Sequence, residues 1–376
     1  MSDISVMIRK ARLEDEPYIR EFTRHTFHFG DYVADALPGW LEEGCDVWVA
    51  DVGGIPVGVV CTGYPAPGEA WFQGMRVHPE YRRQGIATAL TQACIKGAQA
   101  RGARVARVII DSDNYRSIGL ASSIGFRQVA RLIEFDVYPN LLTPYEPLPH
   151  GPQLAITKLE PHRAEEAWEL AKEDIRYIGT CYGEWVFLSP GNLRSMAERG
   201  YMLVAHTPSG KISAGALLDD WYQDDYTQHS LPELEQEITS FFGSLEGIRA
   251  LIHHAAKALC EEAARRGDIL CRLRPSAEDQ SPALEMLRQI AKIEQTRWEA
   301  ARGRAEGKSP ADDTLASGVA LEGKLSSRVA LEGEPTSGIK PTEKHKPIPL
   351  TKRQGPPIVE TGDVMLLWEY PLDGTD

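Results

Sequence analysis

Hydrophobic and polar residues along the first 140 positions alternate between helical and strand periods. Apolar residues at helical spacing predict helices over residues 13–23, 86–100 and 114–124. Alternating or continuous apolar runs predict strands at residues 46–50, 55–61, 71–77, 104–110 and 129–137. Gly53 and Gly54 separate the first two strands and suit a hairpin turn. The resulting order of helix, hairpin, strand, helix, strand, helix and strand indicates a mixed α/β unit.

A similar order recurs after residue 140. Strands are predicted at residues 201–206, 212–218 and 269–273, and helices at 248–266 and 282–293. We interpret residues 364–370 as the strand that closes this second unit. The pattern therefore predicts two domains, 1–140 and 141–376, of which the second is a diverged copy of the first.

The segment at about residues 302–361 has a different composition. It is rich in Gly, Pro, Ser, Lys and Glu, and it carries the pentapeptide VALEG at 319–323 and again at 329–333. Two copies are too few for a repeat architecture. We predict a flexible insertion, and a docking segment for a partner is the alternative.

Composition and charge exclude some classes of function. The 376 residues carry a net charge of −13, which argues against binding nucleic acid through the overall field. No apolar run approaches the roughly 20 residues of a membrane helix, and the first residues lack the pattern of a secretory signal. The six cysteines form no C-x-x-C pair. We therefore expect a cytoplasmic protein with reduced cysteines, no metal site, and no nucleic-acid or membrane partner. The oligomeric state stays open.

The stretch from Met75 to Thr88 carries the clearest chemistry. A strand that ends in Val77-His78-Pro79 leads into the turn Arg-x-x-Gly-x-Ala at Arg82–Ala87, and this turn opens a helix. The free N–H groups and positive end of a helix start suit a pyrophosphate, and the small Gly85 permits close approach. Taken alone, the pattern is also compatible with a basic loop before a helix.

The context makes this stretch specific. Asn114-x-x-Ser117-x-x-Leu120-Ala121 and Gly125-Phe126 follow on the next helix. With these residues, the chain resembles the GNAT superfamily of N-acetyltransferases over residues 5–138. The resemblance implies an α/β (α+β) fold with the mixed central sheet of the GNAT acyl-CoA N-acyltransferases, followed by a degenerate GNAT-like domain. It also implies acetyl-CoA as cosubstrate.

The acetyl-CoA contacts of the family carry over by position. They fall on Met75, Arg76, Val77, Arg82, Arg83, Gln84, Gly85, Ile86, Ala87, Thr88 and Asn114. The resemblance implies that main-chain groups of Met75 and Val77 bind the pantetheine arm and stabilise the oxyanion. The N–H groups from Arg83 through Thr88 would cradle the pyrophosphate, and a splay between the strands at 71–77 and 104–110 would admit the thioester.

The catalytic acid departs from the family pattern. The tyrosine that usually protonates the leaving thiolate falls at Ala121. Tyr115 and Tyr81 are the nearest substitutes in sequence, and Tyr115 is our candidate. Because a thiol has a pKa of about 8.5, water is a further source of this proton.

The base has several candidates. Glu69 lies at the edge of the strand that often carries a glutamate base in the family, and Glu134 lies on the last strand. Glu69 could instead be a solvated strand end, and Glu134 could instead be a salt-bridged residue. His25 and His28 lie in the segment that covers the acceptor pocket in the family, and a histidine can act as a base near neutral pH. We select Glu69 and His28.

A weaker resemblance links the chain to the animal histidine N-acetyltransferases. It rests on Gly30-Asp31-Tyr32, on Trp40-Leu41 and on the tandem organisation, whereas Gln73 stands where that group carries glutamate. We predict acetyl transfer to a primary amine, with a small molecule such as a free amino acid as acceptor. A protein or peptide acceptor and a non-catalytic acetyl-CoA sensor are the alternatives. The turn at 244–249 lacks the leading arginine, so we expect no second CoA site.

Overall fold

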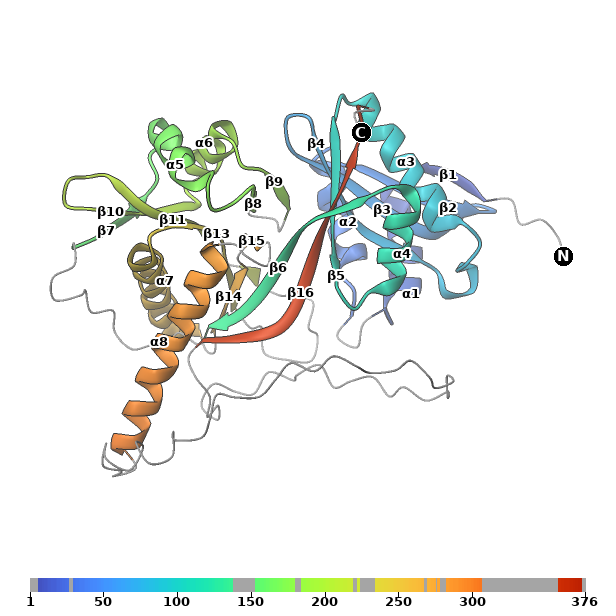
Figure 1. Ribbon diagram of the computed structural model, residues 1–376. Helices are drawn as coiled ribbons and strands as arrows, with labels where there is room; N and C mark the ends of the chain where they lie inside the picture. The colour runs from blue at the N-terminus through green and yellow to red at the C-terminus, as the bar shows by residue number, and fades with distance from the viewer. Residues whose placement is uncertain are drawn as a thin grey trace, which may run out of the picture.

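The computed structural model describes the chain in ten stretches (Figure 1). These are residues 6–26, 30–137, 153–179, 184–218, 222–223, 234–266, 269–274, 276–277, 282–305 and 358–373. Most of the predicted insertion lies outside them. Its first residues continue a helix, and its last residues begin a strand.

The first part follows the predicted order of elements. Its helices and strands are β1 (Met7–Lys10), α1 (Glu16–Thr23), α2 (Val33–Glu42), β2 (Asp46–Val52), β3 (Ile55–Ala66), β4 (Glu69–Val77), α3 (Ile86–Ala100), β5 (Val105–Asp111), α4 (Tyr115–Ile124) and β6 (Arg127–Val137). Sequence analysis did not predict β1 and α2. The helix α2 contains Pro38, which made a helix hard to predict there.

The second part repeats this plan with additions. Its elements are β7 (Ala155–Lys158), α5 (Ala164–Ala171), β8 (Tyr177–Gly179), β9 (Trp185–Phe187), α6 (Pro190–Glu198), β10 (Met202–His206), β11 (Ile212–Leu218), β12 (Tyr222–Gln223), β13 (Leu234–Gly243), α7 (Leu245–Arg266), β14 (Ile269–Arg274), β15 (Ser276–Ala277), α8 (Pro282–Ala305) and β16 (Ile358–Pro371). The order β13, α7, β14, α8 matches β4, α3, β5, α4, as expected for a diverged copy of the GNAT fold.

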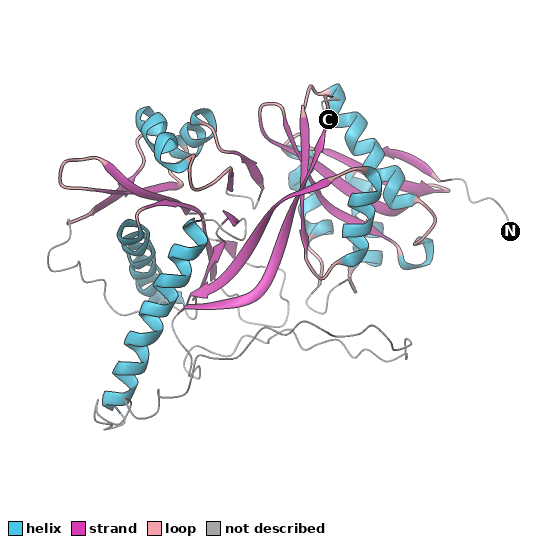
Figure 2. Ribbon diagram, in the orientation of Figure 1, coloured by secondary structure: helices cyan, strands magenta, loops and turns pink. Residues whose placement is uncertain are grey.

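One sheet runs through both parts. Its strand order is β1-β2-β3-β4-β5-β16-β6-β14-β13-β11-β10-β7. The strand beside β5 is β16, from the far end of the chain, and the strand beside β14 is β6, from the first part. Each half of the sheet is therefore completed by a strand from the other part. Figure 2 shows β6 and β16 as long antiparallel strands that pass between the two parts.

The position of β16 corrects one expectation. Residues 364–370 form a strand, but this strand pairs with β5 from Met365↔Asp111 to Pro371↔Val105 rather than closing only the second part. Leu366 and Trp368 pack on the side of α3 and α4, while Leu367 packs on the opposite side. Apolar contacts on both faces are expected for a central strand. The domain boundary near residue 140 stays a prediction.

Helices cover both faces of the first part of the sheet. The helices α3 and α4 enclose one core, which contains Leu90, Phe72 and Phe126. The helices α1 and α2 enclose the other, which contains Leu37 and Cys61. Next to α1 and α2, the β8–β9 hairpin of the second part packs on the same sheet. Within the described ranges, each helix is too short or too polar to cross a bilayer.

Candidate active site

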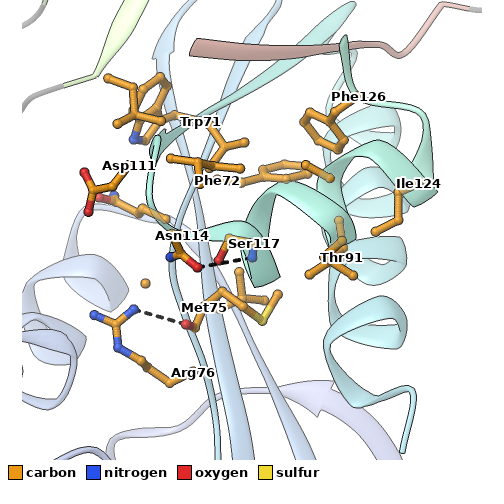
Figure 3. A pocket seen from close by; sticks show the side chains of 18 of the residues that line it. Trp71, Phe72, Met75, Arg76, Thr91, Asp111, Asn114, Ser117, Ile124 and Phe126 are labelled. Carbon is orange, nitrogen blue, oxygen red and sulfur yellow. Dashed lines mark hydrogen bonds between the residues drawn. The ribbon is translucent and has the colours of Figure 1, made fainter. Parts of the chain in front are cut away.

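The strands β4 and β5 separate near their start and leave a cavity between them. Their parallel pairing ends at Trp71↔Arg107. Beyond this pair a cavity of about 380 Å³ opens, as the predicted splay required (Figure 3). Its walls come from β4, β5, α3, α4 and the segment before α2, and they include Tyr32, Phe72, Gln73, Gly74, Met75, Arg76, Ile110, Asn114, Ser117, Ala121 and Phe126.

A β-bulge shapes the wall that β4 forms. Val59 pairs with Arg76 and Cys61 pairs with Gln73, so Gly74 and Met75 together face the single residue Val60. Gly74 has a φ of +68°, which favours glycine. A bulge takes main-chain groups out of the ladder. Of the stretch predicted to bind the pantetheine arm, Met75 lies in this interruption, whereas Arg76 and Val77 pair with Val59 and Gly58 of β3.

Gly74 also allows a close approach that no other residue type permits. A Cβ atom at this position would lie 2.7 Å from Cη2 of Trp40, whereas a Cβ at Gly85 would meet no atom within 4 Å. Both glycines have positive φ. We expect Gly74→Ala to lower the free energy of unfolding by more than Gly85→Ala, for which strain alone costs about 1–2 kcal/mol. Urea denaturation measures both, and equal losses would contradict the close approach of Trp40.

An ion pair joins this bulge to the start of α2. The Arg76 guanidinium contacts Asp31 through Nε–Oδ2 at 2.6 Å and Nη2–Oδ1 at 3.3 Å, and Nη1 donates to the Met75 carbonyl at 3.0 Å. The Asp31 side chain is fully buried and also accepts from the Val33 N–H. Sequence analysis singled out Asp31 and Arg76 separately. Their pairing spans 45 positions, and no local pattern indicates it.

The turn before α3 has the conformation expected of an anion site. Arg83 and Gly85 have φ of +62° and +80°, and α3 begins at Ile86, whose side chain is buried. Left-handed residues before a helix can turn successive N–H groups to one side. Arg82, Arg83 and Gln84 are exposed. The turn is braced by Arg82 Nε, which donates to the Val77 carbonyl at 3.1 Å. Pyrophosphate binding here stays a prediction.

The helix α4 lines the opposite wall of the cavity. Asn114 caps this helix through Oδ1, which accepts from the Ser117 N–H at 3.2 Å (Figure 3). Asn114, Ser117 and Ala121 lie on one face of α4 and all line the cavity. Ala121 supplies no proton donor, but the Ser117 hydroxyl lies one turn earlier. Sequence analysis used Ser117 only as part of the motif.

The predicted catalytic residues are not brought together in the cavity. Tyr115 is 78% exposed and is not among the lining residues. Tyr81 packs its ring edge-on against His78. His28 lies outside the described residues, and His25 is exposed at the end of α1. The roles of Tyr115 and His28 stay predictions.

Glu69 lies between the two parts of the protein. Its carboxylate forms an ion pair with Arg107 of β5 and accepts from the Phe187 N–H at 3.1 Å and from Asn192 Nδ2 at 3.3 Å. Glu69 is not among the cavity-lining residues. Glu69 is buried and held by these three contacts, so the solvated strand end that we considered as the alternative for Glu69 was wrong. Glu134 on β6 is half-buried.

The counterpart turn in the second part is filled by the protein's own groups. A Cβ at Gly247 would lie 2.5 Å from the Ala214 Cβ, and the Gly247 N–H donates to Ser244 Oγ. Arg249 is buried and lies 3.6 Å from the Glu294 carboxylate. Gly247 therefore has little free space beside it, and the absence of a second CoA site stays a prediction.

The comparisons agree with the geometry. Residues 8–126 match the family model described as the acetyltransferase (GNAT) family. The chain is similar to a GCN5-related N-acetyltransferase from Sphaerobacter thermophilus, with 17% identity over 76% of this chain and 91% of that one and a TM-score of 0.50. It is also similar to a fungal GCN5-related glucosamine N-acetyltransferase region, with 14% identity over 77% of this chain and 37% of that one and a TM-score of 0.53.

A tandem GNAT protein from the clavulanic acid biosynthesis pathway aligns over 99% of this chain and 100% of its own at 13% identity, with a TM-score of 0.49. The likeness to the Sphaerobacter and fungal structures extends beyond the family match and shows the fold. Residues 8–126 thus match the GNAT acetyltransferase family and have its fold, and a second, degenerate GNAT-like part follows them in the same chain.

Proposed function

We propose that this protein transfers the acetyl group of acetyl-CoA to the primary amine of a small molecule, such as a free amino acid. The observation that carries the proposal is the cavity between β4 and β5, beside the bulge at Gly74 and Met75. A pantetheine arm can add as a further strand to the edge of β4 that faces the cavity, beyond the point where β4 stops pairing with β5. The turn at Arg82–Gly85 continues from the same strand and can hold the pyrophosphate.

The chemistry follows from this placement. The neutral amine attacks the thioester carbonyl, a main-chain N–H near Met75 or Val77 stabilises the oxyanion, and the C–S bond then breaks. Asn114 lines the cavity at the start of α4, which supports the proposed contact with the arm. Ala121 has no side-chain proton to donate. The leaving thiolate therefore takes its proton from water or from the Ser117 hydroxyl.

The packing of the second part supports a small acceptor. Trp185 and Tyr177 of the β8–β9 hairpin pack against Trp71, at the base of the splay. This contact covers the sheet next to the cavity on the side of α1 and α2. A covered face favours a small amine over an extended protein tail.

The direct test is release of thiol from acetyl-CoA with a panel of acceptors. The panel contains the twenty amino acids, polyamines, aminosugars and short basic peptides. Release with one small amine is the expected result. Release only with peptides would move the proposal to a protein acceptor. Tight acetyl-CoA binding without turnover would favour a sensor. Ala121 motivates this alternative, because it stands where the family usually has the tyrosine that protonates the thiolate.

Charge reversal at Arg83 tests the cofactor site. We expect Arg83→Glu to raise the Kd for acetyl-CoA about 10- to 100-fold, because it places a carboxylate where the pyrophosphate would bind. Lys96→Glu is the matched control, since Lys96 is exposed on α3 and outside its first turn. Isothermal titration measures both variants. Equal affinities of the two variants for acetyl-CoA would show that the pyrophosphate does not bind at this turn.

We also propose a reducing, cytoplasmic setting. Cys45, Cys61 and Cys94 are free, and the thiols of Cys45 and Cys61 are in hydrogen-bond contact. Neighbouring free thiols persist where glutathione and thioredoxin keep them reduced.

A further inference from the structure

The Arg76 side chain turns back onto the main chain of its own strand. Its Nη1 donates to the Met75 carbonyl at 3.0 Å, and Figure 3 shows this contact at the wall of the cavity. The Arg76 carbonyl faces β3, because its oxygen would lie 3.3 Å from a Cβ atom at Gly58. Successive carbonyls of a strand point to opposite sides, so the Met75 carbonyl points to the edge of β4 that faces the cavity. The guanidinium therefore bonds to this edge beyond Trp71, the last residue of β4 that pairs with β5.

A buried carboxylate holds the guanidinium in this place. Arg76 Nε donates to Asp31 Oδ2 at 2.6 Å, and Nη2 donates to Oδ1 at 3.3 Å. The Asp31 side chain has no exposed surface, and only 17% of the Arg76 side chain is exposed. A buried carboxylate is costly to separate from its cation, and a contact through two nitrogen atoms fixes the plane of the guanidinium. Asp31 therefore sets the direction in which Nη1 points.

The start of α2 also supports the bulge by packing. The ring centre of Tyr32 lies 5.7 Å from the Arg76 guanidinium carbon, and this ring packs edge-on against Trp40. Trp40 in turn fills the space beside Gly74, the first residue of the bulge. Tyr32 and Arg76 both line the cavity. The same turn and helix thus form part of the cavity wall and hold the bulge.

The bulge depends on these contacts because the sheet fixes it only weakly. Gly74 and Met75 together face one residue of β3, and the pairing of β4 with β5 has already ended at this point. The direction of main-chain groups that leave the ladder is set by their other contacts. The Met75 N–H, a proposed oxyanion donor, belongs to the residue whose carbonyl Arg76 holds. A displacement of about 1 Å at such a group can cost about 100-fold in rate.

We infer that Arg76 and Asp31 are positioning residues for acetyl transfer. This inference rests on the proposed function. Asp31 orients the guanidinium, the guanidinium fixes the Met75 carbonyl, and the Met75 N–H is thereby aimed at the oxyanion. The C–N bond forms and the C–S bond breaks as in the proposed reaction, and neither side chain gives or takes a proton. The alternative is an ion pair that only stabilises the fold.

Two conservative variants test the pair. Asp31→Asn keeps an oxygen for the Val33 N–H but removes the charge that orients Arg76. Arg76→Lys keeps the charge but replaces a planar group, which reaches both Asp31 and Met75, by a single ammonium. With acetyl-CoA and the amine both saturating, we expect either change to lower kcat about 10- to 100-fold, because the oxyanion donor is no longer aligned. The Kd for acetyl-CoA stays at the wild-type value.

Asp35→Asn is the matched control. Asp35 lies on α2 and pairs with Arg20 of α1, so this variant also breaks an ion pair of the helix, but one that does not reach β4. We expect it to keep the wild-type kcat. The double variant with Asp31→Asn and Arg76→Lys should be no slower than the slower single variant, because both changes act on one contact. Urea midpoints identify conditions in which every variant is folded.

The Met75 carbonyl can also be observed directly. The chain contains one Met-Arg dipeptide, so methionine labelled with ¹³C at the carbonyl and arginine labelled with ¹⁵N give a single amide–carbonyl cross-peak in an NMR spectrum. We expect this cross-peak to move in Asp31→Asn, because the carbonyl loses its hydrogen bond, and to stay in place in Asp35→Asn. An ion pair that only stabilises the fold would leave kcat of the folded protein unchanged.

Two results would overturn the inference. One is a folded Asp31→Asn protein with wild-type kcat or an unmoved cross-peak. The other is a fall in kcat with an equal loss of acetyl-CoA affinity, which would assign the pair to cofactor binding. If the wild-type protein releases no thiol with any amine, the proposed function fails and the cross-peak decides. A cross-peak that moves would then support the control of Met75 by Asp31, and one that does not move would overturn it.

Discussion

Removal of β16 is expected to abolish acetyl-CoA binding, although the family match ends at residue 126. The strand lies between β5 and β6 and hydrogen-bonds to both. Without it, one edge of β5 and one edge of β6 lose their hydrogen-bond partners. The buried side chains of Leu366, Leu367 and Trp368 are also lost from the cores on the two faces of the sheet. Because β5 forms one side of the splayed cavity, the cofactor site loses its wall.

A chain that stops after residue 357 tests this expectation. Isothermal titration with acetyl-CoA and circular dichroism report binding and folding, and a chain that stops after Asp373 is the control. Leu367→Ala gives a graded version, since Leu367 is fully buried and its truncation costs about 2–5 kcal/mol. Wild-type affinity in the chain that lacks β16 would show that the first part closes its own sheet.

The elements could be predicted from the sequence because their signals are local. The apolar period of residues 86–100 and the glycine before it define α3, and the alternation in residues 55–61 defines β3. The location of β16 was not predictable in this way. Its apolar residues on both faces indicate a central strand, but they do not specify which strands lie beside it. Its partner Asp111 is far away in the sequence.

The residues of the candidate site also differ in how local their signals are. The turn at Arg82–Gly85 and the Asn114 cap depend on neighbours within a few residues, so their patterns could be recognised. Glu69 could not be assigned, because its partners come from β5 and from the second part.

Arg107 is the buried cation that pairs with Glu69, and its replacement is expected to lower the stability of the fold more than any other single substitution considered above. Arg107 is 1% exposed and contacts two carboxylates, Glu69 and Glu369, the second through Nε–Oε2 at 2.8 Å. Its guanidinium carbon lies 3.9 Å from the centre of the Phe187 ring of the second part. The arginine therefore connects β4, β5, β16 and the β8–β9 hairpin at the point where the splay begins.

We expect Arg107→Met to lower the free energy of unfolding by about 3–5 kcal/mol, because it leaves two carboxylates without their cation and one of them is buried. Arg104→Met is the matched control, since Arg104 is exposed just before the same strand. Urea denaturation of both variants measures the loss.

The cost comes from uncompensated charge rather than from lost volume, and this has a testable consequence. The further changes Glu69→Gln and Glu369→Gln should recover most of the stability, since replacing a whole buried ion network is often nearly neutral. A deficit that these changes do not relieve would instead assign the effect of Arg107 to its packing on Phe187.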